Sequence, residues 1–325
     1  MKQRVLDVMR GIAAQLKEEE RAGVFSYVQQ REIILRLFND VSSYDISTII
    51  LRLTVIDSLY STNAAYSYFS IEEMAKKIYS LGKDEAAAVE YFKNIASGGS
   101  DCKNLFGEKY GMRKDCASGS KQVSLMSKYA YYVLLRDRSS NLGFPIYDSL
   151  VIKTYPLVCK KLSVAGGNIN TDDITEYVAS LNVLRKELFG NDDNRFEDMQ
   201  QFDILDAYLW RMGKLCGGNY SLLLTREDYK RFISNLSLND NEAQVLWNRF
   251  NAELSRDVAK TTHKSKTGKE TEKYKINFNA IIEYQCRSLE TKSIVSGLKS
   301  GIIFSLIEHW KEYYVEKRII QNIQL

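Results

Sequence analysis

The stretch that decides the fold is residues 123–152, VSLMSKYAYYVLLRDRSSNLGFPIYDSLVI. Its pattern predicts one helix over 123–136 and a second over 149–162, joined through the polar loop 137–143. Asp148 stands immediately before the second helix, at the position where a side-chain oxygen accepts backbone N–H groups. The stretch therefore favours a fold built from helices connected by loops.

Helical patterns continue on both sides of this stretch, and the chain of 325 residues contains only two prolines. Because proline breaks helices, its scarcity permits long helical runs. Before the stretch we expect two apolar helix faces, one formed by Val5, Val8, Met9, Ile12 and Leu16 and the other by Ile33, Ile34, Leu37 and Phe38. Asp45 is expected to cap a third helix. A fourth helix is expected to open with a capping box at Ser70–Glu73 and to close at a left-handed Gly82, and a fifth is expected over 84–95. After it, helices are expected from 171–173 through Leu184 and over 202–214. The predicted fold class is all-α.

Gly217-Gly218 is the predicted boundary between two regions. Residues 1–218 would form one helical domain, and residues 219–325 an additional, mainly helical C-terminal region with a basic insert at 257–275. That insert holds six lysines and three acidic residues, and Lys266-Thr267-Gly268-Lys269 has the composition of a β-hairpin tip.

Composition excludes several classes of protein. The formal charge of +4 permits nucleic-acid binding but does not predict it. Five scattered cysteines argue against a disulfide framework and against zinc or iron–sulfur spacing, and only two histidines are present, so no metal and no cofactor are expected. The chain lacks a signal-peptide pattern and any run of about 18 apolar residues. We therefore expect a soluble cytoplasmic protein without a membrane anchor.

Lys128 and Asp148 are the residues best suited to chemistry. Lys128 lies near the beginning of the predicted 123–136 helix, where the helix dipole and burial would both lower the pKa of its amine. A lysine with a lowered pKa can attack a carbon electrophile. Asp148, held as a helix cap, would stay ionised and stabilise a developing cation. From spacing alone, the alternative of a surface lysine and a plain helix cap stays open.

Three stretches resemble one enzyme superfamily. Lys128-Tyr129-Ala130 with Ile146-Tyr147-Asp148-Ser149 is similar to the helix-hairpin-helix DNA glycosylases, most of all to the 8-oxoguanine DNA glycosylase branch and its bacterial relatives. The segment 56–63, IDSLYSTN, and the segment 206–214, DAYLWRMGK, resemble further parts of the same branch. The resemblance covers roughly residues 45–215 and does not reach the C-terminal third.

The resemblance implies a fold, an activity and a partner. It implies a helix-hairpin-helix glycosylase-like helical bundle that binds duplex DNA and excises an oxidised purine in base excision repair. Lys128 would attack the sugar C1′ of an extruded nucleotide, expel the base and form a Schiff base that can cleave the strand. Asp148 would support the cationic transition state, and Asn63 would enter the gap left by the base.

Further residues are candidates for contacts with DNA. Ser124 and Ser127 lie beside Lys128 where the family contacts phosphate, although Ser124 and Met126 replace the usual hairpin glycines and lose their backbone freedom. Phe144 and Tyr147 would stack on a flipped base, unless they belong to the core. In the basic insert, Lys264, Lys266 and Lys269 would neutralise phosphates, unless the insert is a solvated loop.

An inactive binding module is the alternative to an enzyme. The altered hairpin and the unmatched C-terminal third favour a helical module that recognises nucleic acid or a protein partner, for example in bacterial defence. The position of one amine separates the two hypotheses. If the Lys128 amine and the Asp148 carboxylate face each other across an open cleft, the enzyme is favoured; if the amine points into bulk solvent, the module is favoured.

Overall fold

The computed structural model describes residues 1–22, 27–41, 43–62, 64, 69–82, 84–100, 105–112, 119–137, 139–164, 169, 174–216, 258–264 and 270–276. These residues form nine helices and one pair of antiparallel strands. The fold class predicted from the sequence is thus confirmed for the part of the chain that is described. None of the described helices is long and apolar enough to cross a membrane.

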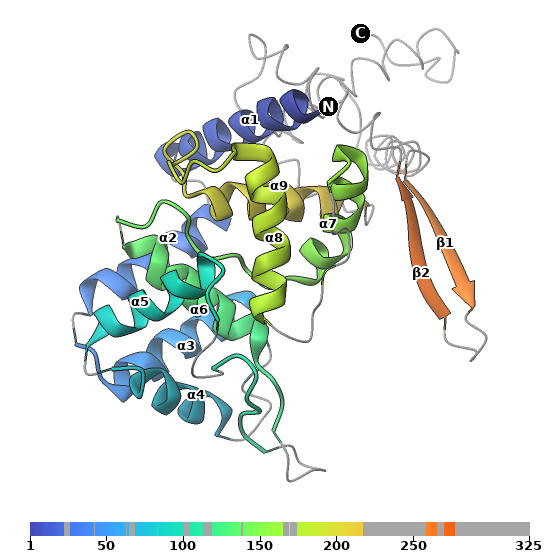
Figure 1. The fold of residues 1–325 in the computed structure, drawn as a ribbon. Coiled ribbons are helices and arrows are strands. Elements are labelled where there is room, and N and C mark those ends of the chain that lie inside the picture. The colour runs from blue at the N-terminus through green and yellow to red at the C-terminus, as the bar shows by residue number, and fades with distance from the viewer. Residues whose placement is uncertain are drawn as a thin grey trace, which may run out of the picture. The chain divides into compact units, whose positions relative to one another are not determined.

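The chain divides into two compact units, residues 19–210 and residues 1–18 together with 211–325. The first unit holds α2 (Tyr27–Asp40), α3 (Ile46–Tyr60), α4 (Ser70–Tyr79), α5 (Glu85–Ala96), α6 (Val123–Arg136), α7 (Ser149–Leu162), α8 (Ile174–Phe189) and most of α9 (Gln201–Cys216) (Figure 1). The second holds most of α1 (Lys2–Ala22) and both strands. The predicted boundary at Gly217-Gly218 lies outside the described residues.

Helix α6 is the central helix of the 19–210 unit. It packs against α2, α3 and α5, and every residue from Leu125 to Leu134 is buried. A helix that is enclosed on all sides must be apolar around most of its circumference. Lys128 is the one charged residue within that buried segment, and it follows Ser127 in the sequence.

Aromatic rings fill the core beside α6. Phe144 stacks on Phe106 with ring centroids 5.7 Å apart, and the edge of Phe92 meets Phe144 at 5.9 Å. Phe92 also contacts Tyr129 of α6 at 6.3 Å. Phe144 is fully buried, so the loop that precedes α7 is anchored by its own aromatic side chain.

A buried arginine connects three helices of the same unit. The fully buried Arg52 of α3 pairs with Glu85 of α5 at 2.6 Å and donates to the backbone oxygens of Phe38 and Val41 at 3.1 and 3.0 Å. Arg136 at the end of α6 pairs with the other carboxylate oxygen of Glu85 at 2.5 Å. The network holds α3, α5 and α6 together.

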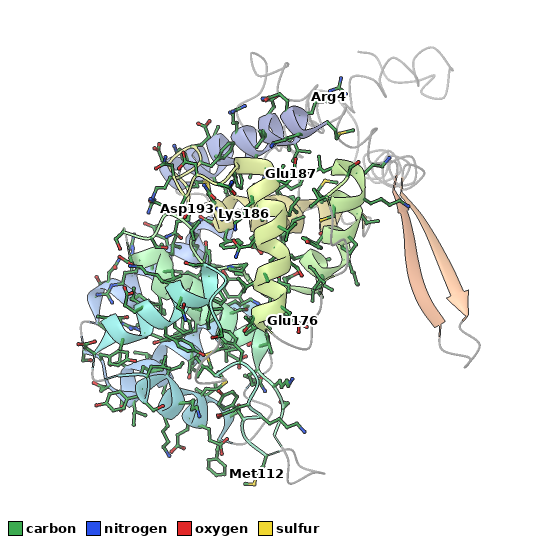
Figure 2. All side chains as sticks on the ribbon, viewed as in Figure 1. Arg4, Met112, Glu176, Lys186, Glu187 and Asp193 are labelled. Carbon is green, nitrogen blue, oxygen red and sulfur yellow. The ribbon has the colours of Figure 1, made fainter. Side chains whose placement is uncertain are left out.

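Charged and capping side chains lie at several helix ends. Asp45 caps α3, as expected, by accepting from the Thr48 N–H at 2.7 Å. Figure 2 shows Glu176 near the beginning of α8, where its negative charge complements the helix dipole, and Lys186 with Glu187 near its end.

Two predictions about α4 are wrong. Ser70 is the first residue of the helix rather than its cap, and its hydroxyl donates to the Ala64 carbonyl at 2.6 Å. Glu73 accepts from the Gly111 N–H at 2.6 Å instead of closing a capping box. Gly82 does not adopt the left-handed conformation; a Cβ there would lie 2.2 Å from the Cβ of Ala87, so glycine permits a close approach. Ser70 and Glu73 thus form hydrogen bonds with residues outside the helix rather than with each other's backbone.

The second unit contains α1 and a β-hairpin. The predicted apolar stripe of α1 is confirmed at Val5, Val8, Met9 and Ile12, which are buried, whereas Leu16 is half-buried. Strands β1 (Val258–Lys264) and β2 (Glu270–Ile276) pair antiparallel, with Lys264 opposite Glu270. The predicted hairpin is thus confirmed in its strands, whereas its tip and the expected C-terminal helices lie outside the described residues.

Candidate functional site

Lys128 lies in the second turn of α6 and is buried, with only 4% of its surface exposed. Its amine donates to the Ser124 hydroxyl at 2.8 Å and approaches the Ser124 carbonyl oxygen at 3.5 Å. It also lies 5.4 Å from the centre of the Tyr60 ring. Lys128 therefore does not point into bulk solvent, which was the geometry expected of an inactive module.

Burial is the main influence on the Lys128 amine. It lowers the pKa of Lys128 because the charged form loses water, while the negative charges of Asp148 and Asp206 act in the opposite direction. Within the described part of the chain, the hydrogen bonds of this amine go to Ser124, and no salt bridge joins it to either carboxylate. An amine so placed is available as a nucleophile for a larger fraction of the time than an exposed one.

Asp148 caps α7, as the sequence predicts. Its Oδ1 accepts from the Leu150 N–H at 2.7 Å, and its backbone is extended at φ −133° and ψ 139°. The cap holds the carboxylate in one orientation at the end of the helix that carries the positive dipole. The negative charge of Asp148 acts on the pKa of Lys128, raising it against the effect of burial.

Asp206 of α9 is the site residue that sequence reasoning missed. Its carboxyl lies deep among protein atoms even though the residue keeps a partly exposed surface. Burial raises the pKa of Asp206 well above its usual value, and the negative charges of Asp148 and Asp203 raise it further, while Lys128 lowers it. Asp206 opens the quoted segment 206–214, but no local signal separates it from an ordinary helical aspartate.

Two hydrogen bonds fix the loop before α7 against α6. The Tyr147 N–H donates to the Ser127 hydroxyl at 2.9 Å, and that hydroxyl donates to the Ser124 carbonyl at 3.0 Å. Ser127 directly precedes Lys128, and Tyr147 directly precedes Asp148. These bonds therefore connect the backbone next to Lys128 with the backbone next to Asp148. Ser127 is fully buried, so its hydroxyl serves this connection.

Helix α9 is joined to α6 and α7 in a similar way. The Tyr131 hydroxyl of α6 donates to Asp203 Oδ1 at 2.8 Å, and Arg31 of α2 pairs with Asp203 Oδ2 at 2.7 Å. The Thr154 hydroxyl of α7 donates to the Leu209 carbonyl at 3.0 Å. These bonds bring α9, and with it Asp206, to the cluster formed by Lys128 and Asp148.

Tyrosines enclose the cluster on two sides. The Tyr177 hydroxyl of α8 donates to the Ile146 carbonyl at 2.6 Å, and its ring lies 5.1 Å from that of Tyr147. On the α3 side, the hydroxyls of Tyr60 and Tyr132 are 2.7 Å apart. Burial raises the pKa of Tyr177 well above its usual value, and the charges of nearby carboxylates add to the effect. Tyr177 is therefore a neutral hydrogen-bond donor at ordinary pH.

The other predicted site residues are scattered. Ser124 lies against the Lys128 amine, Tyr147 borders the cluster, and Phe144 belongs to the aromatic core. Lys264 ends β1 in the other unit, and its side chain is not among those described. Asn63, Lys266 and Lys269 lie outside the described residues.

No protein-family model, curated protein or solved structure matches this chain. The groups of the site are a buried amine, a capped carboxylate, a second carboxyl that binds a proton tightly, and neutral tyrosine hydroxyls. Together they can attack an electrophilic carbon, stabilise positive charge and move a proton.

Proposed function

We propose that the chain is a DNA glycosylase with AP lyase activity that excises an oxidised purine from duplex DNA through Lys128. The observation that carries the proposal is the buried Lys128 amine, whose pKa burial lowers and on which the charge of the helix-capping Asp148 acts. The segments 56–63, 128–149 and 206–214, which resemble the glycosylase superfamily, all belong to the unit that contains this site, apart from the last few residues of 206–214.

The reaction needs a neutral amine at the sugar carbon. The Lys128 lone pair forms a bond to C1′, and the glycosidic bond breaks with its electron pair leaving on the base, which takes up a proton. The new secondary ammonium then loses a proton, and its nitrogen lone pair forms the C1′=N bond as the C1′–O4′ bond breaks. The electron pair of that bond goes to the ring oxygen, which takes up a proton, and the resulting Schiff base permits strand cleavage. The negative charge of Asp148 stabilises the positive charge that develops on the sugar.

The hydroxyl of Ser124 supports this role although it replaces a family glycine. Ser124 lies one helical turn before Lys128, and its oxygen accepts a hydrogen bond from the amine at 2.8 Å. A hydrogen bond of this kind orients the lone pair without adding a charge that would hold the proton on nitrogen. Ser124 is thus proposed as an orienting residue for the nucleophile, in place of a phosphate contact.

Borohydride trapping tests the proposal. The full chain is incubated with a duplex oligonucleotide that carries one 8-oxoguanine, with a duplex that carries one abasic site, and with undamaged duplex. Sodium borohydride reduces a Schiff base to a stable adduct, which a denaturing gel separates from free protein. We expect adducts with the damaged duplexes, and peptide mass spectrometry is expected to place them on Lys128.

Matched variants make the result specific to one amine. Lys128→Met is expected to lose the adduct, whereas Lys160→Met, which removes an exposed lysine of α7, is expected to keep it. Adduct formation that survives Lys128→Met contradicts the assignment. Binding of duplex DNA without adduct or base release on any of a panel of damaged bases would instead identify a nucleic-acid-binding module.

A further inference from the structure

The helix faces that carry Lys128 and Asp206 are turned toward each other. Residues three apart lie on one face of a helix, so Lys128 shares a face with Tyr131 on α6, and Asp206 shares a face with Asp203 on α9. The hydrogen bond of 2.8 Å between Tyr131 and Asp203 brings these two faces into contact. The mutual electrostatic influence of Lys128 and Asp206 agrees with this placement.

Few charged or titratable groups surround the pair among the residues that the structure describes. The charge of Asp148, which precedes α7, acts on both groups, and Tyr177 of α8 is influenced by both carboxylates. Tyr60 of α3 faces the amine with its ring. Asp203 faces Asp206 from its own helix, but Arg31 and Tyr131 already bind it.

The pair can hold one proton in two ways. In the first, an ammonium on Lys128 faces a carboxylate on Asp206; in the second, a free amine faces a carboxylic acid. The second form arises by moving one proton from Nζ to a carboxyl oxygen, which leaves the net charge of the pair unchanged. Because burial penalises each separated charge, the neutral form gains relative to the charged form as water is excluded.

Two observations favour the neutral form. A buried ammonium and carboxylate recover their desolvation cost only by direct contact, yet in the described residues no salt bridge joins Lys128 to Asp206. The amine instead donates to Ser124, a neutral partner that suits a free amine. Asp206, for its part, lies beside the carboxylates of Asp148 and Asp203, which oppose a further negative charge.

We propose that Asp206 is the proton-holding residue of the site, so that at neutral pH Lys128 is a free amine beside the carboxylic acid of Asp206. Its use in catalysis rests on the proposed function, whereas the position of the proton does not. Asp206 would act through Lys128 by keeping the nucleophile uncharged.

Infrared difference spectroscopy tests where the proton lies. A protonated carboxyl group has a carbonyl stretch that a carboxylate lacks. The spectrum of the full chain at neutral pH minus that of Asp206→Asn is expected to contain this acid band. Glu176→Gln, which removes an exposed carboxylate of α8, is expected to lack the band in the same comparison. A carboxylate signal in place of the acid band for Asp206 overturns the proposal.

Nuclear magnetic resonance of the wild-type chain gives a measurement that needs no variant of Asp206. The full chain is labelled with 13C in lysine, and the Lys128 Cε resonance is assigned by its absence in Lys128→Arg. At neutral pH we expect this resonance at the position of a free amine, shifted away from the reference resonance of the exposed Lys160. A Lys128 resonance at the ammonium position overturns the proposal even if Asp206→Asn does not fold.

Neither measurement contains DNA, so its outcome is independent of borohydride trapping. An acid band with a free amine but no trapped adduct would retain the proton-holding pair and remove the glycosylase. An adduct on Lys128 with a carboxylate at Asp206 would retain the glycosylase and assign the activation of the amine to burial alone.

Discussion

Replacing Lys128 by methionine should make the stability of the chain depend on pH near neutrality. In the wild-type folded state the neutral pair of Lys128 and Asp206 binds one proton. In the unfolded state at neutral pH the lysine binds one proton and the aspartate none, so folding neither takes up nor releases a proton at this pair. Lys128→Met removes the lysine proton from the unfolded state but leaves the proton on folded Asp206.

The magnitude follows from proton linkage. The pKa of Asp206 is raised in the folded state above its ordinary value of 3.8, so its contribution to stability is complete below that value. As pH rises from there toward the raised pKa, the variant loses about 1.4 kcal/mol of unfolding free energy per pH unit. Lys128 lowers the pKa of Asp206, so without Lys128 the pH window over which stability falls extends further upward.

Urea unfolding at a series of pH values measures this slope, with the helical circular dichroism signal as the probe. Stability of Lys128→Met should fall with rising pH relative to wild type. Asp206→Asn should show the opposite slope, because the folded Lys128 amine then releases a proton that the unfolded one keeps. The double variant should return to the wild-type slope. A Lys128→Met slope equal to that of wild type would refute the raised proton affinity of Asp206.

Two further substitutions separate structure from chemistry. Asp148→Asn keeps a cap of equal quality, so unfolding free energy should change by only a few tenths of a kcal/mol while borohydride trapping falls; undiminished trapping would show that the negative charge is not used. Arg52→Met removes one partner of a buried ion pair and should lower the unfolding free energy, measured in urea, by about 3 kcal/mol. This value is at the lower end of the range for breaking a buried pair, because Glu85 keeps its second partner Arg136. The exposed control Arg36→Met should cost less than about 1 kcal/mol, and a comparable loss in both would contradict the role of burial.

Local features of the sequence predicted the helices well. The helix over 123–136 and the one over 149–162 have the predicted bounds, and Asp45 and Asp148 are the predicted caps. These features depend on residues within one or two turns of each other. Apolar periodicity and capping chemistry therefore suffice to place them.

The errors arose where distant residues compete for a group. The Ser70 hydroxyl bonds to Ala64 across a loop, and Glu73 bonds to the Gly111 backbone, so neither forms the capping box that their spacing suggested. Phe144 had two open interpretations, and packing against Phe106 places it in the core. Local pattern cannot rank such partners, because their distance in space depends on how the helices pack.

The same division applies to the site. The amino-acid sequence alone determined which residue types were present: an amine in a helix with few polar neighbours and an aspartate ahead of the next helix. Only the tertiary structure buried that amine and brought Asp206 to it from a helix beginning more than seventy residues further along the chain. The physical reason is that proton affinity depends on the water excluded and the charges nearby in space, and both are properties of packed helices rather than of neighbouring residues.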